Sequence, residues 1–353
     1  MSRLWASIVW YGNDYSMVTI YDIAKEAGAS KSTVANALTG KGKISEATRQ
    51  RILLCAREMG YRPNVIARYL CQHKTLTIAL VLPSLANPFY PEIMEAIENI
   101  VREYEYQTLF CITNGDFVLG REQMERLMSR WVDGYIVMGS SLDMADITSY
   151  LRQGVPIVLC DWQENEIPVG IPQVSVDFYR AGQLAGEYLL ALGHRRIAVI
   201  FDEPQQRLRL EGFQSVLQTA GIPLPPELIQ RGNSTLESGA AAAKNLLARS
   251  ERPTAIFATT DWMALGAMEV ILDEGLRIPQ DISVIGLDDI VISAHLRPPL
   301  TTIAIPKSQL AKEAAELLLG QIDGNKDMPV SHLAEPYLVL RQSTTSPPGQ
   351  DQP

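Results

Sequence analysis

Short apolar runs, each the length of a strand, recur along most of the chain. Seven of them end in a polar residue or a turn signal: TIALVLP (77–83), QTLFCITN (107–114), GYIVMGS (134–140), PIVLCD (156–161), RIAVIFDE (196–203), AIFATTD (255–261) and ISVIGLDD (282–289). Amphipathic segments with helical period separate them. Because continuous apolar strands that alternate with helices are typical of sheets covered on both faces, residues 76–341 are predicted to form an α/β body with doubly wound parallel sheets.

Charge is distributed unevenly between this body and the segment before it. The chain has 353 residues and a net charge of −9, yet residues 19–74 contain ten basic and four acidic residues. A chain of this length exceeds the size at which a single core keeps growing, so more than one domain is expected. An acidic body repels nucleic acid, whereas a basic segment attracts it. The sequence therefore predicts a small basic head on a large acidic body.

Three capping residues divide the basic segment into three helices. Thr19, with Asp22 three residues later, has the pattern of a capping box, and Ser30 and Ser45 are placed to cap the second and third helices. The third helix is expected to bury Ile52, Leu53, Ala56 and Met59. These boundaries predict an all-α domain over residues 18–62.

The second of these helices has few apolar residues for a core. Its inward face is predicted to consist of Val34, Ala37 and Leu38, and its polar side chains Lys31, Ser32, Thr33 and Asn36 are predicted to face outward. Two short helices joined by a glycine-containing turn form a helix-turn-helix, whose second helix enters the major groove. An ordinary three-helix bundle with a solvated face is the alternative. Because such a face needs no excess of positive charge, the basic composition favours DNA binding.

The segment TIYDIAKEAGASKSTVANALTGKGKISEATRQRILLCAREMGYRPNVIARYL resembles the N-terminal headpiece of the LacI/GalR family of bacterial transcriptional repressors. The likeness continues to about Arg341 through NPFY, LGHRRIAVI, RLRLEGF, PTAIFATTDWMALGAM, GLRIPQDISVIGLDD and PPLTTIAIP. It implies a two-lobed body similar to type I periplasmic binding proteins, and a homodimer. One departure concerns Ala35 and Asn36, where the family usually has Ser-Arg. Asparagine prefers adenine and arginine prefers guanine, so the operator sequence stays open.

Residues 63–75 are expected to form a hinge helix and linker. Pro63 and Asn64 can start a helix that covers Val65 to about Cys71, which is shorter than the ~12–15 residues at which an isolated helix becomes marginally stable. In the family this helix pairs with that of the dimer partner and inserts a leucine into the minor groove, and Leu70 occupies the matching position. A plain interdomain linker is the alternative.

The pattern of caps and the resemblance together name the residues expected to contact double-stranded operator DNA. They are Thr19, Tyr21, Ser30, Lys31, Ser32, Thr33, Asn36, Ser45, Thr48, Tyr61, Asn64, Ala67, Arg68 and Leu70.

A second expected site lies in the body, because doubly wound sheets bind ligands at the carboxyl ends of their strands. Carboxylates and aromatic rings follow the predicted strands, and together with an arginine such groups suit a hydroxyl-rich ligand such as a sugar. The effector site of the family maps onto Asn87, Phe89, Tyr90, Asp161, Arg209, Trp262 and Asp288. Asp261 can instead be read as a helix cap, and His194 as a helix-end residue.

Several classes of protein are disfavoured by the sequence. It contains no phosphate-binding loop, nucleophile elbow or zinc-protease helix, and its four cysteines form no C-x-x-C pair, so no enzyme, cofactor or metal site is expected. No apolar segment has the length of a membrane span, and no convincing signal peptide is present, which favours the cytoplasm. A sugar-binding protein of periplasmic type without DNA function is the alternative, but it has no use for a basic helix-turn-helix.

The two ends of the chain lack the periodicity of the rest. Residues 1–17 and 342–353 are expected to be disordered, and the second of these segments has no leucine heptads that would hold a tetramer. The sequence as a whole predicts a dimeric, cytoplasmic transcriptional repressor whose operator affinity is controlled by a small carbohydrate or related metabolite. Whether that metabolite induces or co-represses stays open.

Overall fold

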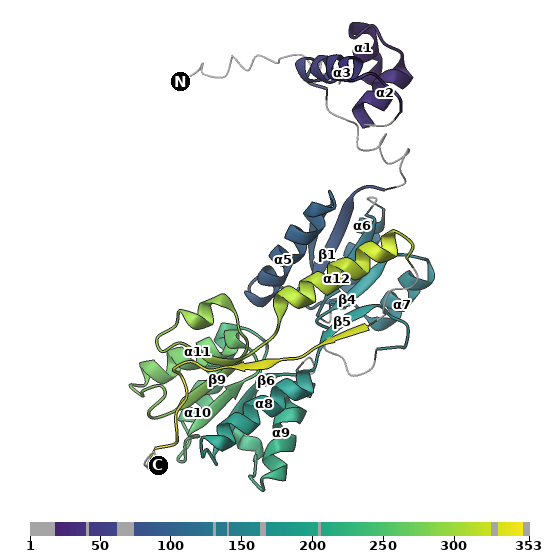
Figure 1. Cartoon of the computed structure of the whole chain (residues 1–353). Coiled ribbons are helices and arrows are strands. Elements are labelled where there is room, and N and C mark those ends of the chain that lie inside the picture. Colours follow the sequence, from purple (N-terminus) through teal and green to yellow (C-terminus); the bar gives the residue numbers. More distant parts are fainter. Residues whose placement is uncertain are drawn as a thin grey trace, which may run out of the picture. The chain divides into compact units, whose positions relative to one another are not determined.

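A computed structural model describes residues 18–39, 42–61, 74–129, 132–139, 141–162, 167–203, 206–325 and 331–348. The chain divides into two compact units, a head (Met1–Thr75) and a body (Leu76–Pro353), which are drawn in Figure 1. Asn64, Ala67, Arg68 and Leu70, for which DNA contacts were predicted, lie outside the described residues, as do residues 1–17.

The head contains the three predicted helices, α1 (Ile20–Glu26), α2 (Lys31–Thr39) and α3 (Glu46–Glu58). Ile23, Val34 and Ile52, one from each helix, are completely buried and form the centre of the core. The prediction that Leu53 is buried is wrong, because 38% of this residue is exposed. Ile52 and Ala56 define the inward face of α3, and Leu53 points about 100° away from Ile52 around the helix.

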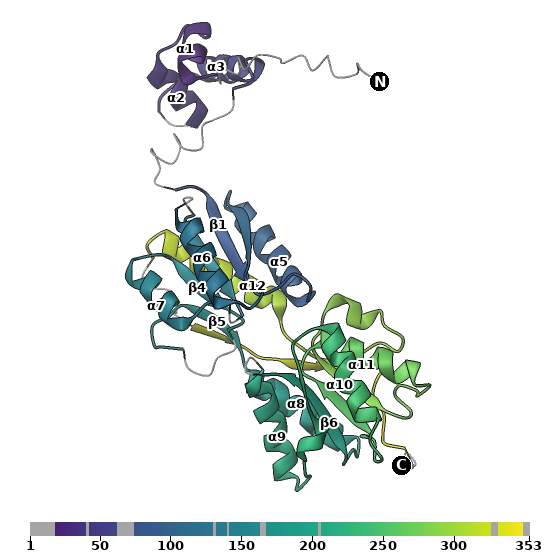
Figure 2. The same cartoon turned by 180° about the vertical axis from the view of Figure 1, so that it is seen from behind.

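The first lobe of the body is built on a six-stranded parallel sheet with the order β11-β5-β4-β3-β1-β2. Its strands are β1 (Thr77–Leu82), β2 (Gln107–Ile112), β3 (Gly134–Met138), β4 (Ile157–Cys160), β5 (Gln173–Val176) and β11 (Ser331–Ala334). Its helices are α5 (Phe89–Glu103), α6 (Phe117–Met128), α7 (Met144–Arg152) and α12 (Lys307–Ile322). Helices α5 and α12 cover one face of the sheet and α6 and α7 the other, as Figures 1 and 2 show.

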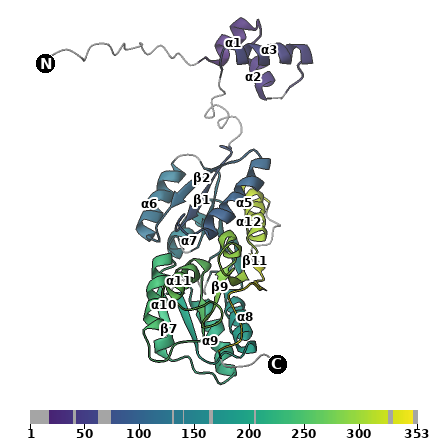
Figure 3. The ribbon, with the colours of Figure 1, turned by 90° about the vertical axis from the view of Figure 1, so that its left-hand side faces the viewer.

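The second lobe repeats this plan with the strand order β12-β10-β9-β8-β6-β7. Its strands are β6 (Ile197–Asp202), β7 (Ile229–Gly232), β8 (Ala255–Ala258), β9 (Ser283–Asp288), β10 (Thr301–Ala304) and β12 (Tyr337–Val339). Its helices are α8 (Phe178–Ala191), α9 (Arg207–Thr219), α10 (Leu236–Leu247) and α11 (Asp261–Asp273), with short 3-10 turns η1 (Pro226–Leu228) and η2 (Val291–Ala294). Figure 3 shows α8 and α9 on one side of this sheet and α10 and α11 on the other.

Three segments of the chain connect the two lobes, between β5 and α8, between β10 and α12, and between β11 and β12. The last of them is the yellow C-terminal stretch of Figure 1, which runs from one sheet into the other. Each lobe is therefore assembled from segments that are distant in the sequence.

All seven predicted strands are present, with two differences from the prediction. Strand β2 lies at the edge of its sheet, so Leu109 and Phe110 are 40% and 52% exposed rather than buried. Strand β12 pairs with β10 in the antiparallel direction, so the second sheet is not wholly parallel. Strands β5, β7, β10, β11 and β12 were not predicted.

The expectation of a disordered tail is wrong for the part of it that the structure describes. Ser343 is completely buried, and its hydroxyl donates to the carbonyl of Val284 at 2.6 Å and accepts the N–H of Thr301 at 2.8 Å. The N–H of Val284 in turn donates to the carbonyl of Ser343. The polar composition of the segment is explained by these bonds, which pair it with the ends of β9 and β10.

Candidate effector and DNA-binding sites

A cavity of about 690 Å³ lies between the two lobes of the body. Its lining comes from the loops after the carboxyl ends of β1, β2, β6, β7, β8 and β9, as expected for doubly wound sheets. The predicted residues that line it are Asn87, Phe89, Tyr90, Arg209, Trp262 and Asp288. Six of the seven predicted effector residues are thus brought together from both lobes.

The turn from β1 into α5 supplies the aromatic wall of the cavity. The side-chain oxygen of Asn87 accepts the N–H of Phe89 at 3.1 Å, which fixes the first turn of α5. The rings of Phe89 and Tyr90 then pack edge to face, with 5.4 Å between their centroids. Burial raises the pKa of Tyr90 well above its usual value, and the nearby charge of Asp161 adds to the rise. The phenol therefore stays protonated at neutral pH, beside apolar surface that suits the C–H face of a sugar ring.

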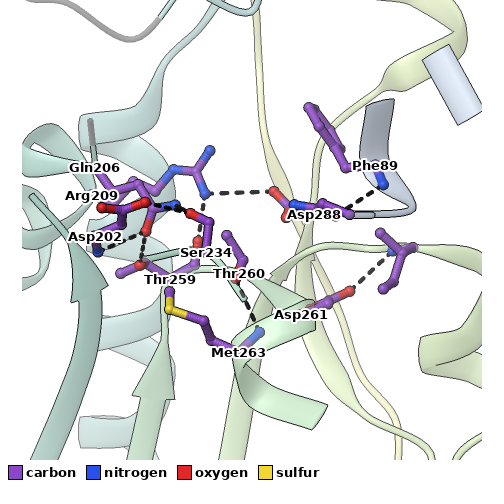
Figure 4. A network of polar contacts seen from close by, with 12 residues as sticks. Phe89, Asp202, Gln206, Arg209, Ser234, Thr259, Thr260, Asp261, Met263 and Asp288 are labelled. Atoms are coloured by element: carbon purple, nitrogen blue, oxygen red, sulfur yellow. Dashed lines mark hydrogen bonds and ion pairs between the residues drawn. The ribbon is translucent and has the colours of Figure 1, made fainter. Parts of the chain in front are cut away.

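Arg209 and Asp288 face the cavity from the second lobe. Both side chains are 2% exposed, and 3.5 Å separates Arg209 Nη1 from Asp288 Oδ1. Arg209 also donates to the carbonyl of Thr259 and lies over the ring of Phe178, at 4.4 Å from its centroid. These contacts hold the guanidinium in one orientation, and Figure 4 shows the ion pair with Asp288 and the hydrogen bond to Thr259.

The hydrogen-bonding capacity of this pair is not exhausted within the protein. Arg209 Nε and Asp288 Oδ1 are buried and have no hydrogen-bond partner among the described residues. Burial raises the pKa of Asp288 well above its usual value, while the charge of Arg209 opposes that rise. Buried polar groups rarely stay unpaired without a functional reason. A donor and an acceptor are therefore both left for a ligand.

The cavity has a third wall that the sequence did not predict, formed by Asp202, Gln206 and Ser234. The Ser234 hydroxyl donates to Asp202 Oδ2 at 2.7 Å, and Gln206 Nε2 donates to Ser234 Oγ at 2.8 Å (Figure 4). Asp202 is the last residue of β6, so the strand-end rule that named Asp288 could also have named it. Ser234 lies in a loop with no comparable signal.

Asp161 and Asp261 do not have the positions predicted for them, in the effector site and at the N-cap of a helix. Asp161 follows β4 and is completely buried, but it is not among the residues that line the cavity, and its charge raises the pKa of both Tyr90 and Asp288. The alternative that Asp261 is a helix cap is wrong, because Thr260 caps α11 by accepting the N–H of Met263.

Asp261 has a structural role instead. Its carboxylate accepts hydrogen bonds from the hydroxyls of Thr302 and Ser293, each at 2.6 Å, and from the N–H of Ile290 at 3.0 Å. These bonds tie β10 and η2 to the start of α11. They support the loop that carries Asp288 without reaching the cavity.

His194 follows the end of α8 and is completely buried. Its Nδ1 lies 2.9 Å from Thr254 Oγ1, and its Nε2 lies 2.9 Å from the carbonyl oxygen of Thr345. A carbonyl only accepts, so Nε2 carries the proton and Nδ1 accepts from the threonine. These contacts give the ring a structural role, holding the C-terminal segment in place.

The predicted DNA-contacting residues of the head are accessible to different degrees. Thr19, Tyr21, Ser30, Lys31, Ser32 and Ser45 are exposed, whereas Thr33, Asn36, Thr48 and Tyr61 are half-buried.

Local hydrogen bonds place the hydroxyl groups of the head at the starts of its helices. Ser30 Oγ accepts the N–H of Thr33 at 3.1 Å, and Ser45 Oγ accepts the N–H of Thr48 at 3.2 Å. The N-terminal ends of α2 and α3 are thus capped as predicted. Helix N-termini carry partial positive charge, which favours contact with phosphate.

The start of α2 also combines a cation with an aromatic ring. Lys31 Nζ lies 3.4 Å above the ring of Tyr21, which is 58% exposed. Asn36, further along the helix, is only half-buried and lies against Gly42. A Cβ atom at Gly42 would lie 2.9 Å from Asn36 Nδ2, and the φ angle of this glycine is +82°. The turn after α2 therefore needs glycine at this position.

Over the described parts of the chain, no group of three or more His, Cys, Asp or Glu residues is arranged to hold a metal ion. None of the helices described is both long and apolar enough to cross a membrane.

A three-helix head with a helix-turn-helix, joined to a two-lobed α/β body with a polar cavity, defines a ligand-responsive DNA-binding regulator. Residues 19–64 match the family model described as bacterial regulatory proteins, lacI family, and residues 187–344 match that of a periplasmic binding protein-like domain. The chain belongs to the lacI family of bacterial regulatory proteins.

Relatives with assigned roles resemble the chain over nearly its whole length. The ribose operon repressor of Haemophilus influenzae is 35% identical over 94% of this chain and 99% of its own length. The transcriptional repressor CytR of Escherichia coli is 34% identical over 94% of this chain and 97% of its own.

Solved structures agree with this assignment. The Lac repressor dimer bound to operator and the anti-inducer ONPF has a TM-score of 0.83 at 29% identity, covering 93% of this chain and 99% of that one. A LacI-family regulator from Enterococcus faecium with bound ribose has a TM-score of 0.69 at 30% identity, covering 76% of this chain and 99% of its own.

Proposed function

We propose that this protein represses transcription by binding a pseudo-palindromic operator as a homodimer, with an affinity set by a small carbohydrate or related metabolite. The observation that carries the proposal is the buried pair of Arg209 and Asp288, which lines a cavity of about 690 Å³ and keeps one donor and one acceptor without a partner among the described residues. Relatives named as a ribose operon repressor and as regulators bound to ribose or cellobiose support a sugar as effector.

The head supplies the DNA-binding surface in this proposal. Helix α2 enters the major groove, where the hydroxyls of Ser32 and Thr33 and the amide of Asn36 contact bases or phosphates. Lys31, whose ammonium group lies over the ring of Tyr21, contacts a phosphate in this proposal. The excess of positive charge over residues 19–74 supplies attraction that does not depend on sequence.

The body supplies the switch. Residues of both lobes line the cavity, so a ligand that contacts both changes the relative stability of open and closed arrangements. The proposed hinge over residues 63–75 transmits that change to the head, and Leu70 is the proposed minor-groove wedge. We place the protein in the cytoplasm, where operator DNA is, and assign it no catalytic activity.

Selection of DNA from a random library by the full-length protein tests the DNA-binding step. Enrichment of one pseudo-palindromic sequence is expected, and its affinity should change at least about fivefold with one member of a sugar panel that includes ribose and cellobiose. Sugar binding without any sequence preference would instead favour a periplasmic-type binding protein without DNA function.

A further inference from the structure

The wall formed by Asp202, Gln206 and Ser234 is a chain of hydrogen bonds with a defined direction. The backbone N–H of Asp202 donates to Gln206 Oε1 at 3.1 Å, and the Thr259 hydroxyl donates to the same oxygen. Because a backbone N–H can only donate, Oε1 is the acceptor end of the amide and Nε2 is the donor end. Gln206 is 3% exposed, so solvent does not compete for these bonds.

The chain of hydrogen bonds runs on from Gln206 through Ser234 to Asp202 in the cavity wall. Gln206 Nε2 donates to Ser234 Oγ, so the single proton of that hydroxyl is left for Asp202 Oδ2, 2.7 Å away (Figure 4). The chain therefore ends on Asp202 Oδ2, an oxygen that accepts a hydrogen bond and so carries no proton itself. Burial raises the pKa of Asp202, whereas the bond from Ser234 and the charge of Arg209 oppose that rise.

The charges of the residues that line the cavity also disfavour an anionic ligand beside Asp202. Among the described residues that line it, Asp202, Glu203, Glu237 and Asp288 carry carboxyl groups and Arg209 carries the one cation, while Glu203 also pairs with Arg231 at 2.7 Å. That cation already lies 3.5 Å from Asp288 and donates to a backbone carbonyl. A phosphate or carboxylate of a ligand placed beside Asp202 would meet like charge and an acceptor without a proton.

Building on the proposed function, we propose that Asp202 is a specificity-determining residue of the effector cavity. It accepts a hydrogen bond from a hydroxyl or amino group of the effector and excludes an anionic group at that position. The effector is accordingly an uncharged or amino-bearing polyhydroxylated molecule rather than a phosphorylated or carboxylated one. Arg209 and Asp288 hold a different part of the same molecule.

Matched sets of probes that differ only in charge test this assignment on the full-length protein. One set is ribose and ribose 5-phosphate, another is glucose, glucosamine and glucose 6-phosphate, and cellobiose represents larger neutral sugars. Thermal unfolding screens the probes, and titration calorimetry measures the affinity of those that bind. At least one uncharged or amino probe should bind, and its phosphate ester should bind about tenfold or more weakly. Binding of a phosphate ester more tightly than its parent, or no binding by any uncharged or amino probe, would overturn the proposal.

Asp202→Asn supplies the variant, because an amide keeps an oxygen that can accept from Ser234 while it removes the charge. Affinity for the probe that binds should fall about tenfold, and the preference over the phosphate ester should shrink. Asp273→Asn removes an exposed carboxylate of α11 outside the cavity and should change neither value. Equal affinities for wild type and Asp202→Asn would contradict the role of Asp202.

The outcomes for this inference and for the proposed function are separable. A probe that binds as predicted but leaves operator affinity unchanged contradicts the regulatory function and leaves the role of Asp202 intact. A phosphate ester that binds in the cavity and changes operator affinity contradicts the role of Asp202 and supports the regulatory function.

Discussion

Glu92 and Lys307 form an ion pair of 3.1 Å at the junction of the two lobes. Both belong to the first lobe, yet each also contacts the second. Glu92 Oε1 accepts the N–H of Val291 at 2.8 Å, and Lys307 Nζ donates to the backbone carbonyls of Asp288 and Asp289. The pair therefore joins the first lobe to the loop that positions the carboxylate of Asp288 in the cavity.

Lys307→Met should weaken this junction, because it removes the donor to the carbonyls of Asp288 and Asp289 and the cation paired with Glu92. The free energy of unfolding should fall by about 1–3 kcal/mol, measured by urea denaturation of the full-length protein. Lys312→Met, on the same helix, removes a lysine that is 66% exposed and should change stability by less than about 0.5 kcal/mol. Similar losses for both variants would mean that the junction contributes nothing beyond a surface pair.

Asp288→Asn tests the effector site itself. The variant keeps the shape of the strand end but loses the charge-assisted bonds to a hydroxylated ligand, so the effector concentration for half response should rise about 10- to 100-fold. Operator affinity without effector should stay close to that of wild type.

The coupling between the two sites of the wild-type protein must be reciprocal. If the effector changes operator affinity by a given factor, operator DNA must change effector affinity by the same factor. Equal effector dissociation constants with and without operator would show that the body does not regulate the head.

Base and phosphate contacts of the head should respond differently to substitution. Asn36→Ala should cost about 1–3 kcal/mol of binding free energy on the selected operator and much less on mismatched sites. Lys43 is exposed outside α2, so Lys43→Met should weaken binding to all sequences alike and reduce the salt slope by about one unit. Affinity measured over a range of salt concentrations separates the two, and uniform losses from both variants would mean that α2 docks differently.

We expect the exposed apolar residues of the edge strand β2 to form part of the homodimer interface. Phe110 is a large apolar residue, 52% exposed on an edge strand, and Leu109 beside it is 40% exposed. Phe110→Asp should therefore shift the protein from dimer to monomer at micromolar concentration, as sedimentation equilibrium would show. Val169→Asp changes an apolar residue that is fully exposed elsewhere and should leave the dimer intact. A dimer of unchanged affinity in Phe110→Asp would place the interface on another surface.

Because the ring of His194 is buried, we expect the folded protein to lose stability in mild acid. Burial lowers its pKa from the usual 6.5, while the hydrogen bond to Thr345 opposes that change. The folded protein therefore prefers the neutral ring, and below pH 6.5 the unfolded chain binds more protons. The stability that His194 contributes is complete above that pH and is lost as the pH falls. Urea denaturation between pH 8 and pH 5 should show a shallower decline for His194→Gln than for wild type, and identical slopes would contradict the prediction.

Features that depend on neighbours in the sequence were predictable. Thr19, Ser30 and Ser45 were named as caps because their partners lie three residues away, and the carboxylate of Asp22 does accept the Thr19 N–H at 2.8 Å. The strand ends placed Asn87 and Asp288 in one site because parallel strands present their carboxyl ends at the same edge of a sheet, and the resemblance to the family added Arg209.

Features that depend on distant partners were decided by the tertiary structure alone. Ser234 meets Asp202 across 32 residues, and Ser343 meets Val284 across 59, and no local pattern marks either pair. The same holds for Leu53, which is exposed because the small core of the head has room for only one face of α3. Capping and periodicity are set by hydrogen bonds and side-chain directions within a few residues. The surroundings of a side chain are set by which remote segment packs against it, and that is determined only when the whole chain folds.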